Sequence, residues 1–128
     1  MADDLELSAV LDLLTELREL PPGASVPEGL RYRLLGAARG MGAGALGVRG
    51  KERERLRSAL GDDPSARERL LGFLDDGSPD VRSWAGSYVE QLLPEDEAVE
   101  SLTEALREEA DGEAASWLAM SLARVTPR

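Results

Sequence analysis

The chain has 128 residues, enough for one compact domain, and is 42% apolar and 31% charged with a formal charge of -10. It contains neither cysteine nor histidine, which excludes disulfides, Ser-His or Cys-His catalysis and zinc sites made from those ligands. The acidic start and the lack of a long uncharged apolar run predict a cytoplasmic protein without a membrane segment. Its 14 arginines against one lysine favour a GC-rich bacterial source.

Apolar side chains at helical spacing predict helices along the whole chain, and no strand-like alternation occurs. The first expected helix covers about residues 4–20 and is stopped by the two prolines and glycine at 21–23. The second opens at Pro27. The glycine-rich stretch 40–47 predicts a loop or a frayed helix, because each glycine costs a helix ~1 kcal/mol relative to alanine. A charged helix is expected over 48–60.

Capping residues and prolines mark the helix boundaries in the second half of the chain. A capping aspartate followed by Pro64 opens a helix that breaks after Leu74, and Ser78 followed by Pro79 opens one that runs to about Leu93. Two further helices are expected within 95–125, where acidic residues at the first N-terminus suit the helix dipole. The sequence thus predicts about seven helices.

An internal repeat relates the second half of the chain to itself. Ser83-Trp84-Ala85 recurs as Ser116-Trp117-Leu118, an offset of 33 residues. Leu70 and Leu74 recur as Leu102 and Leu106, an offset of 32 residues. Because one helical hairpin cannot bury its apolar side alone, stacked copies are expected to share a core.

The predicted fold class is therefore all-α, a short right-handed α-solenoid of stacked helical hairpins in a single domain over 1–128. Its expected parts are a capping helix (1–22), a degenerate repeat (27–60) and two repeats (64–93 and 95–125).

The sequence LLGFLDDGSPDVRSWA at 70–85 resembles a bacterial HEAT repeat. The match extends over 66–93 and is partial over 96–125, where Ala114-Ala115 replaces the Val-Arg pair and the turn proline is missing. The resemblance implies that Asp76 or Asp80 and Arg82 bond to neighbouring repeats. It also implies a binding scaffold, since most such proteins are scaffolds. The iron hydroxylases with His-Glu pairs are excluded because the chain has no histidine.

Two groups of side chains are candidate binding sites. Arg49, Arg53 and Arg57 share one helix face, and with Arg82 they could bind an acidic group through paired guanidinium hydrogen bonds. The alternative is a solvated face neutralised by nearby glutamates. Three aromatic side chains at helical or repeat-equivalent positions either pack in the core or anchor a partner. These are Trp84, Tyr88 and Trp117.

No cofactor or metal site is expected. The glycines at 42–47 spell a dinucleotide fingerprint but lack the strand that such a site needs. The aspartates at 75–80 do not have EF-hand spacing and suit a turn and a helix cap. Thirteen acidic residues within 70–113 disfavour binding to nucleic acid.

We therefore expect a non-catalytic binding or scaffold module that presents a charged helical surface to a protein partner. One alternative is an acidic immunity or antitoxin protein that blocks a basic toxin. Another is a small-molecule enzyme or carrier with a cleft near Trp84 and Trp117. The oligomeric state stays open, as does the course of residues 40–50.

Overall fold

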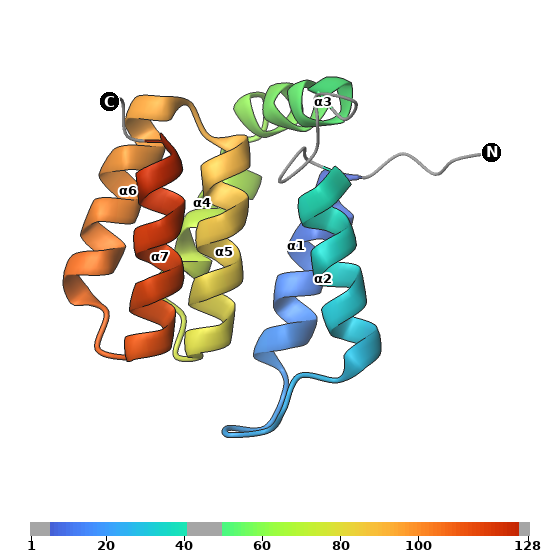
Figure 1. Cartoon of the computed structure of the whole chain (residues 1–128). Coiled ribbons are helices and arrows are strands. Elements are labelled where there is room, and N and C mark those ends of the chain that lie inside the picture. The colour runs from blue at the N-terminus through green and yellow to red at the C-terminus, as the bar shows by residue number, and fades with distance from the viewer. Residues whose placement is uncertain (1–5, 41–49, 126–128) are drawn as a thin grey trace.

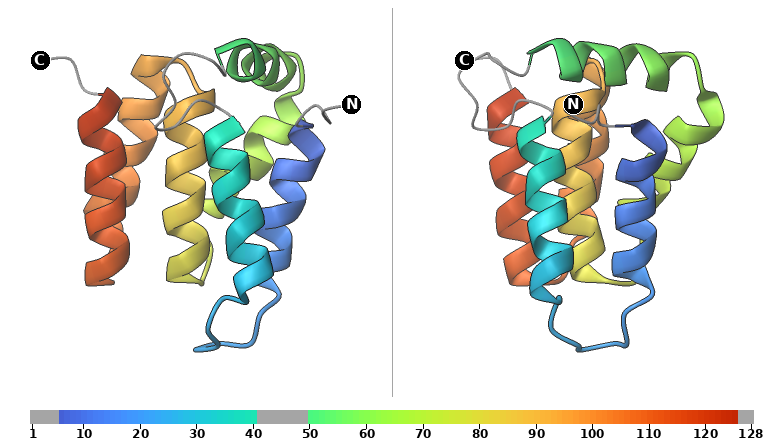
Figure 2. Two further views of the ribbon diagram at one scale, coloured as in Figure 1. Left: turned by 45° about the vertical axis from the view of Figure 1, so that its right-hand side comes forward. Right: turned by 90° about the vertical axis from the view of Figure 1, so that its right-hand side faces the viewer.

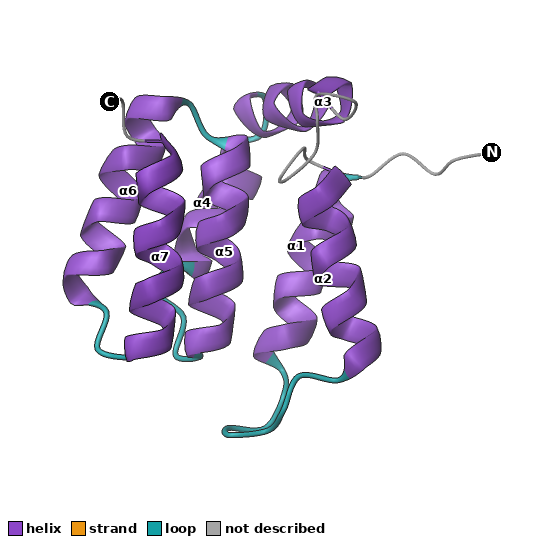
Figure 3. Ribbon diagram, viewed as in Figure 1, coloured by secondary structure: helices purple, strands orange, loops and turns teal. Residues whose placement is uncertain are grey.

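The computed structural model describes residues 6–40 and 50–125, which form seven α-helices and no strand (Figure 3). This confirms the predicted all-α class and helix number. No helix in the described ranges is long and apolar enough to cross a bilayer. The expected glycine-rich loop lies, from residue 41 onward, outside the described residues. The helices are α1 (Leu7–Arg18), α2 (Glu28–Gly40), α3 (Gly50–Gly61), α4 (Pro64–Phe73), α5 (Pro79–Leu92), α6 (Glu95–Glu108) and α7 (Gly112–Val125).

Six of the helices pair along the chain, α1 with α2, α4 with α5 and α6 with α7, while α3 lies at the upper end of the molecule and packs on α1, α4 and α5 (Figure 1). Helices α2, α5 and α7 all start at the lower end of Figure 1 and run side by side in one direction. The two turned views place these three helices on one side of the molecule, with α1 and α4 behind them (Figure 2). One side of the molecule is thus formed by three parallel helices.

The helices in the range 27–60 do not pack as the hairpin that the sequence predicts. Helix α2 packs on α1 and α5, whereas α3 packs on α1, α4 and α5. The chain reverses directly after α1, and Gly23 in this turn adopts a φ of 80°, which a residue with a side chain rarely adopts. This early reversal makes α1 the packing neighbour of α2 in place of α3.

The predicted repeat is visible in the local structure of α5 and α7, which have the same length and begin 33 residues apart. The side chains of Ser78 and Asp111 cap the two helices by accepting from the amides of Val81 and Ala114. Ser83 Oγ donates to Pro79 O at 2.9 Å, and the equivalent Ser116 Oγ donates to Gly112 O at 3.1 Å. The two helices therefore begin in the same way although different residues cap them.

Helix α5 lies at the centre of the core and contacts each of the other six helices. Its apolar side chains are almost fully excluded from solvent, namely Val81, Ala85, Tyr88, Val89 and Leu92. Gly86 lets α7 approach closely, because a Cβ at this position would stand 2.6 Å from Leu118 Cδ2. The α5–α7 contact thus depends on the missing side chain.

We predict that Gly86→Val lowers the free energy of unfolding by about 2 kcal/mol, because the added side chain overpacks the contact with Leu118. Gly72→Val is the matched control, since nothing lies within 4 Å of the position that its Cβ would take. Urea denaturation followed by circular dichroism measures both variants. Equal stabilities of the two variants would contradict the proposed close approach.

Candidate functional site

Large apolar side chains are exposed on α2 and α7, two of the three helices that form one side of the molecule, which we call the α2–α5–α7 face. On α2, Tyr32 is 77% exposed and Leu35 is 42% exposed. On α7, Trp117 is 50% exposed and Met120 is 47% exposed. These four are the large apolar residues that the described part of the chain exposes. Large apolar side chains exposed on neighbouring helices are a feature of protein-binding surfaces.

The three predicted aromatic residues have different environments. Tyr88 is fully buried and its hydroxyl donates to Leu34 O of α2 at 2.9 Å. Burial raises the pKa of this hydroxyl, so it keeps the proton that it donates. Trp84 is half-buried, with its ring centroid 6.2 Å from that of Tyr88. Tyr88 is therefore a core residue that joins α5 to α2, Trp84 packs at the edge of the core, and Trp117 is the exposed aromatic residue.

The arginines of α3 do not present a solvated row of charges. Arg57 Nε donates to Gln91 O at 2.8 Å, and Arg53 Nη1 donates to Gln91 Oε1 at 3.4 Å. Gln91 O belongs to the last turn of α5, where carbonyl groups have no partner within the helix. Arg53 and Arg57 thus fix α3 to the end of α5, and Arg57 also pairs with Glu54. Arg49 lies outside the described residues.

Arg82 binds a buried carboxylate instead of facing solvent. Its Nε and Nη2 atoms each donate to one oxygen of Glu109 at 2.7 Å, and Nη1 donates to Asp76 O at 2.7 Å. The side chains of Arg82 and Glu109 are 19% and 1% exposed. The hydrogen bond from Arg82 lowers the pKa of Glu109, and the same bond raises the pKa of Arg82. This pair connects α5 to the segment between α6 and α7.

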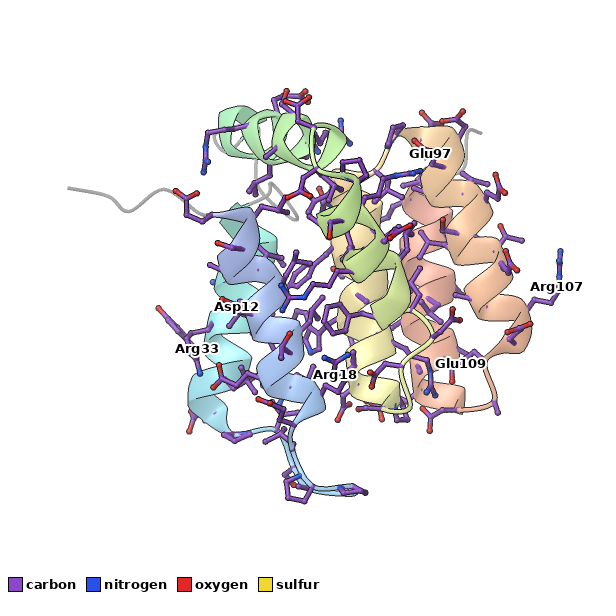
Figure 4. The ribbon with its side chains drawn as sticks, turned by 180° about the vertical axis from the view of Figure 1, so that it is seen from behind. Asp12, Arg18, Arg33, Glu97, Arg107 and Glu109 are labelled. Atoms are coloured by element: carbon purple, nitrogen blue, oxygen red, sulfur yellow. The ribbon has the colours of Figure 1, made fainter. Side chains whose placement is uncertain are left out.

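The aspartates of the α4–α5 turn have different roles. Asp76 Oδ1 lies 3.7 Å from Arg18 Nη1 of α1, and Asp76 Oδ2 accepts from the amide of Ser78. Arg18 also stacks on the Phe73 ring, 4.9 Å from its centroid. Viewed from behind, Arg18 extends toward α4, and Glu109 lies in the segment between α6 and α7 (Figure 4). Asp80 is exposed in the first turn of α5.

A chain of hydrogen bonds that was not predicted from the sequence crosses the upper part of the molecule. Arg124 Nη1 of α7 donates to Glu90 Oε1 at 2.8 Å, and Gln91 Nε2 donates to Glu90 Oε2 at 2.9 Å. Glu90 and Gln91 are both buried. A buried carboxylate requires a partner, and Arg124 supplies it. The signal for these hydrogen bonds in the sequence was the adjacent polar pair Glu90 and Gln91, which lies on the helix that the other helices contact.

Neither Trp84 nor Trp117 lines the two pockets found among the described residues. One, of about 500 Å³, lies beside the ion pair of Arg67 and Glu97, and the other lies where α1, α3 and α4 meet. Among the described side chains, no group of three or more acidic residues is arranged to hold a metal ion.

No family model, curated protein or solved structure matches this chain. The functional interpretation therefore rests on the surface of the molecule.

We predict that Glu109→Gln lowers the free energy of unfolding at pH 7 by about 1–3 kcal/mol, because Arg82 loses a charged partner in a largely buried pair. Because the folded protein lowers the pKa of Glu109, protonation of this carboxyl group favours the unfolded chain. The wild type should lose this stabilisation as the pH falls below 4.5, the ordinary pKa of the group. Glu109→Gln should lack that part of the pH dependence.

Thermal unfolding between pH 3 and pH 7 tests this prediction. Glu100→Gln is the control, because Glu100 is exposed. The prediction fails if the two variants have the same stability and the same pH profile.

Proposed function

We propose that this chain is a non-catalytic binding module whose α2–α5–α7 face docks on a protein partner. The observation that carries the proposal is the exposure of Tyr32, Leu35, Trp117 and Met120 on the two helices beside α5. Large aromatic and sulfur-containing side chains are the residue types enriched in protein interfaces. The resemblance of residues 66–93 to a HEAT repeat supports the same role.

The arginines available to this partner differ from those predicted from the sequence. Arg53, Arg57 and Arg82 each make hydrogen bonds to groups within the molecule, which hold their side chains against the fold. On α2, by contrast, Arg31 and Arg39 are exposed and form no ion pair within the described part of the chain. The apolar side chains of the face are thus accompanied by the arginines of α2.

The ionisable groups give little support to an enzyme. The lowered pKa values of Glu16 and Glu109 have a hydrogen bond from arginine as their first cause, and the raised pKa of Tyr88 follows from burial. Each shift is thus explained by a contact that stabilises the fold. A catalytic carboxylate is instead recognised by a shift within a pocket.

A second candidate, an acidic protein that blocks a basic partner, is favoured by the outer side of α6. Exposed acidic residues follow one another there at four-residue spacing, and Arg107 is the one base of this helix. These residues are Asp96, Glu100, Glu104 and Glu108. Such a row of charges would attract a basic surface and accelerate association.

Affinity capture from the native cell with a tagged chain separates the two candidates. We predict that the double variant Trp117→Ser and Met120→Ser loses the bound protein, with at least about a tenfold lower yield, because hot-spot residues carry most of the binding energy. The matched control replaces Glu100 and Glu104 of α6 by serine and should retain it. Circular dichroism confirms that both variants fold.

Capture that does not change in the α7 variant would contradict docking on the α2–α5–α7 face. Loss in the α6 variant alone would favour the second candidate.

A further inference from the structure

The same arrangement of exposed side chains occurs on α2 and on α7. In each helix an acidic residue is followed by an aromatic residue, an apolar residue and an arginine, in steps of four, three and four positions. Steps of three and four keep side chains on one side of a helix. All eight side chains are exposed. They are Glu28, Tyr32, Leu35 and Arg39 on α2, and Glu113, Trp117, Met120 and Arg124 on α7.

Helix stability explains only part of this arrangement. An acidic first turn and a basic last turn both interact favourably with the helix dipole. The dipole gives no reason for two large apolar side chains between them to face water. On the outer side of α6, the exposed positions of the same kind are charged. The apolar pairs are therefore particular to α2 and α7.

The four exposed side chains on each helix form a row. Each row is complementary to a copy of itself that runs in the opposite direction. Glu113 and Arg124 are equally distant in sequence from the midpoint between Trp117 and Met120. Glu28 and Arg39 are equally distant from the midpoint between Tyr32 and Leu35. Because α2 and α7 run in the same direction, one two-fold axis across both midpoints would reverse both rows together (Figure 1). Self-complementarity of this kind is what a two-fold interface requires.

We propose that the partner of the α2–α5–α7 face is a second copy of this chain, bound antiparallel about such an axis. Helix α7 then lies on α7 of the second copy and α2 lies on α2. Each acidic residue meets an arginine at both ends of each helix pair, and the aromatic residue of each row meets the apolar residue of the other. The proposal rests on the proposed function and names its partner.

The charges at the ends of α2 are available for such contacts. Glu28 and Arg39 are exposed and form no ion pair within the described residues. Arg124 uses one donor for Glu90 while its side chain stays about half exposed. A guanidinium group has five donors, so Arg124 can serve Glu90 and a carboxylate of the second copy together.

Sedimentation velocity of the full chain over a range of concentrations tests the proposal. The wild type should associate to a dimer, and Trp117→Ser, which changes an exposed residue, should raise the dissociation constant at least about tenfold. A wild type that stays monomeric throughout would overturn the proposal.

A charge exchange on α2 tests the antiparallel arrangement. Glu28→Arg and Arg39→Glu should each weaken the dimer at least about tenfold, because each places two pairs of like charges across the axis. An equimolar mixture of the two variants should dimerise again, since every end contact then joins opposite charges. Glu104→Arg mixed with Arg107→Glu, both exposed on α6, should behave as the wild type does.

A mixture that remains as weak as its components would overturn the proposed arrangement, as would a dimer that none of these changes affects. Failure of this proposal can be distinguished from failure of the proposed function. If the chain is monomeric but still captures another protein through Trp117, docking on this face stands and the second copy is excluded as its occupant.

Discussion

The central position of α5, which packs against every other helix, is the constraint on which the rest of the structure depends. This helix contacts the other six, and its apolar residues apart from the half-buried Trp84 are almost fully excluded from water. Its polar groups must then be satisfied by neighbours. Tyr88 binds a carbonyl of α2, Glu90 binds Arg124 of α7, and Arg82 binds Glu109 beyond α6. Each polar partner thus connects α5 to another part of the chain.

The same packing positions the surface that we interpret as functional. Helices α2 and α7 lie on either side of α5 and run in one direction (Figures 1 and 2). Gly86 brings α7 close, and the Tyr88 hydroxyl joins α2. Their exposed apolar side chains therefore stand on a rigid support. Contacts made by residues on regular helices lose less conformational entropy on binding than contacts made by mobile loops.

Features that depend on residues close together in the sequence could be predicted from it. Ser78 with Pro79, and the aspartate before Pro64, predict the starts of α5 and α4, because capping is a contact within four residues. The offset of 33 residues likewise predicts the equivalent starts of α5 and α7. The pairing of α2 with α1 could not be predicted by subtracting this offset, because α3 stands between the α1–α2 and α4–α5 pairs and makes the spacing unequal.

The candidate site was predicted only in part, because side-chain partners are contacts between distant parts of the chain. The spacing of Arg53 and Arg57 correctly suggests one helix face, but not that this face points to Gln91. Trp84 and Trp117 occupy equivalent repeat positions and still differ in exposure, because α5 is packed against more helices than α7 is. The rows on α2 and α7 are visible in the sequence only after the structure shows which residues are exposed.

Amide hydrogen exchange resolved by residue tests the central position of α5 most directly. We predict that the amides of α5 around Ala85 and Val89 exchange only through global unfolding, with a free energy equal to that measured by denaturation. Amides of α6, which is covered on fewer sides, should open at lower free energy. Exchange of α5 amides through local opening, at a lower free energy than those of α6, would contradict the account.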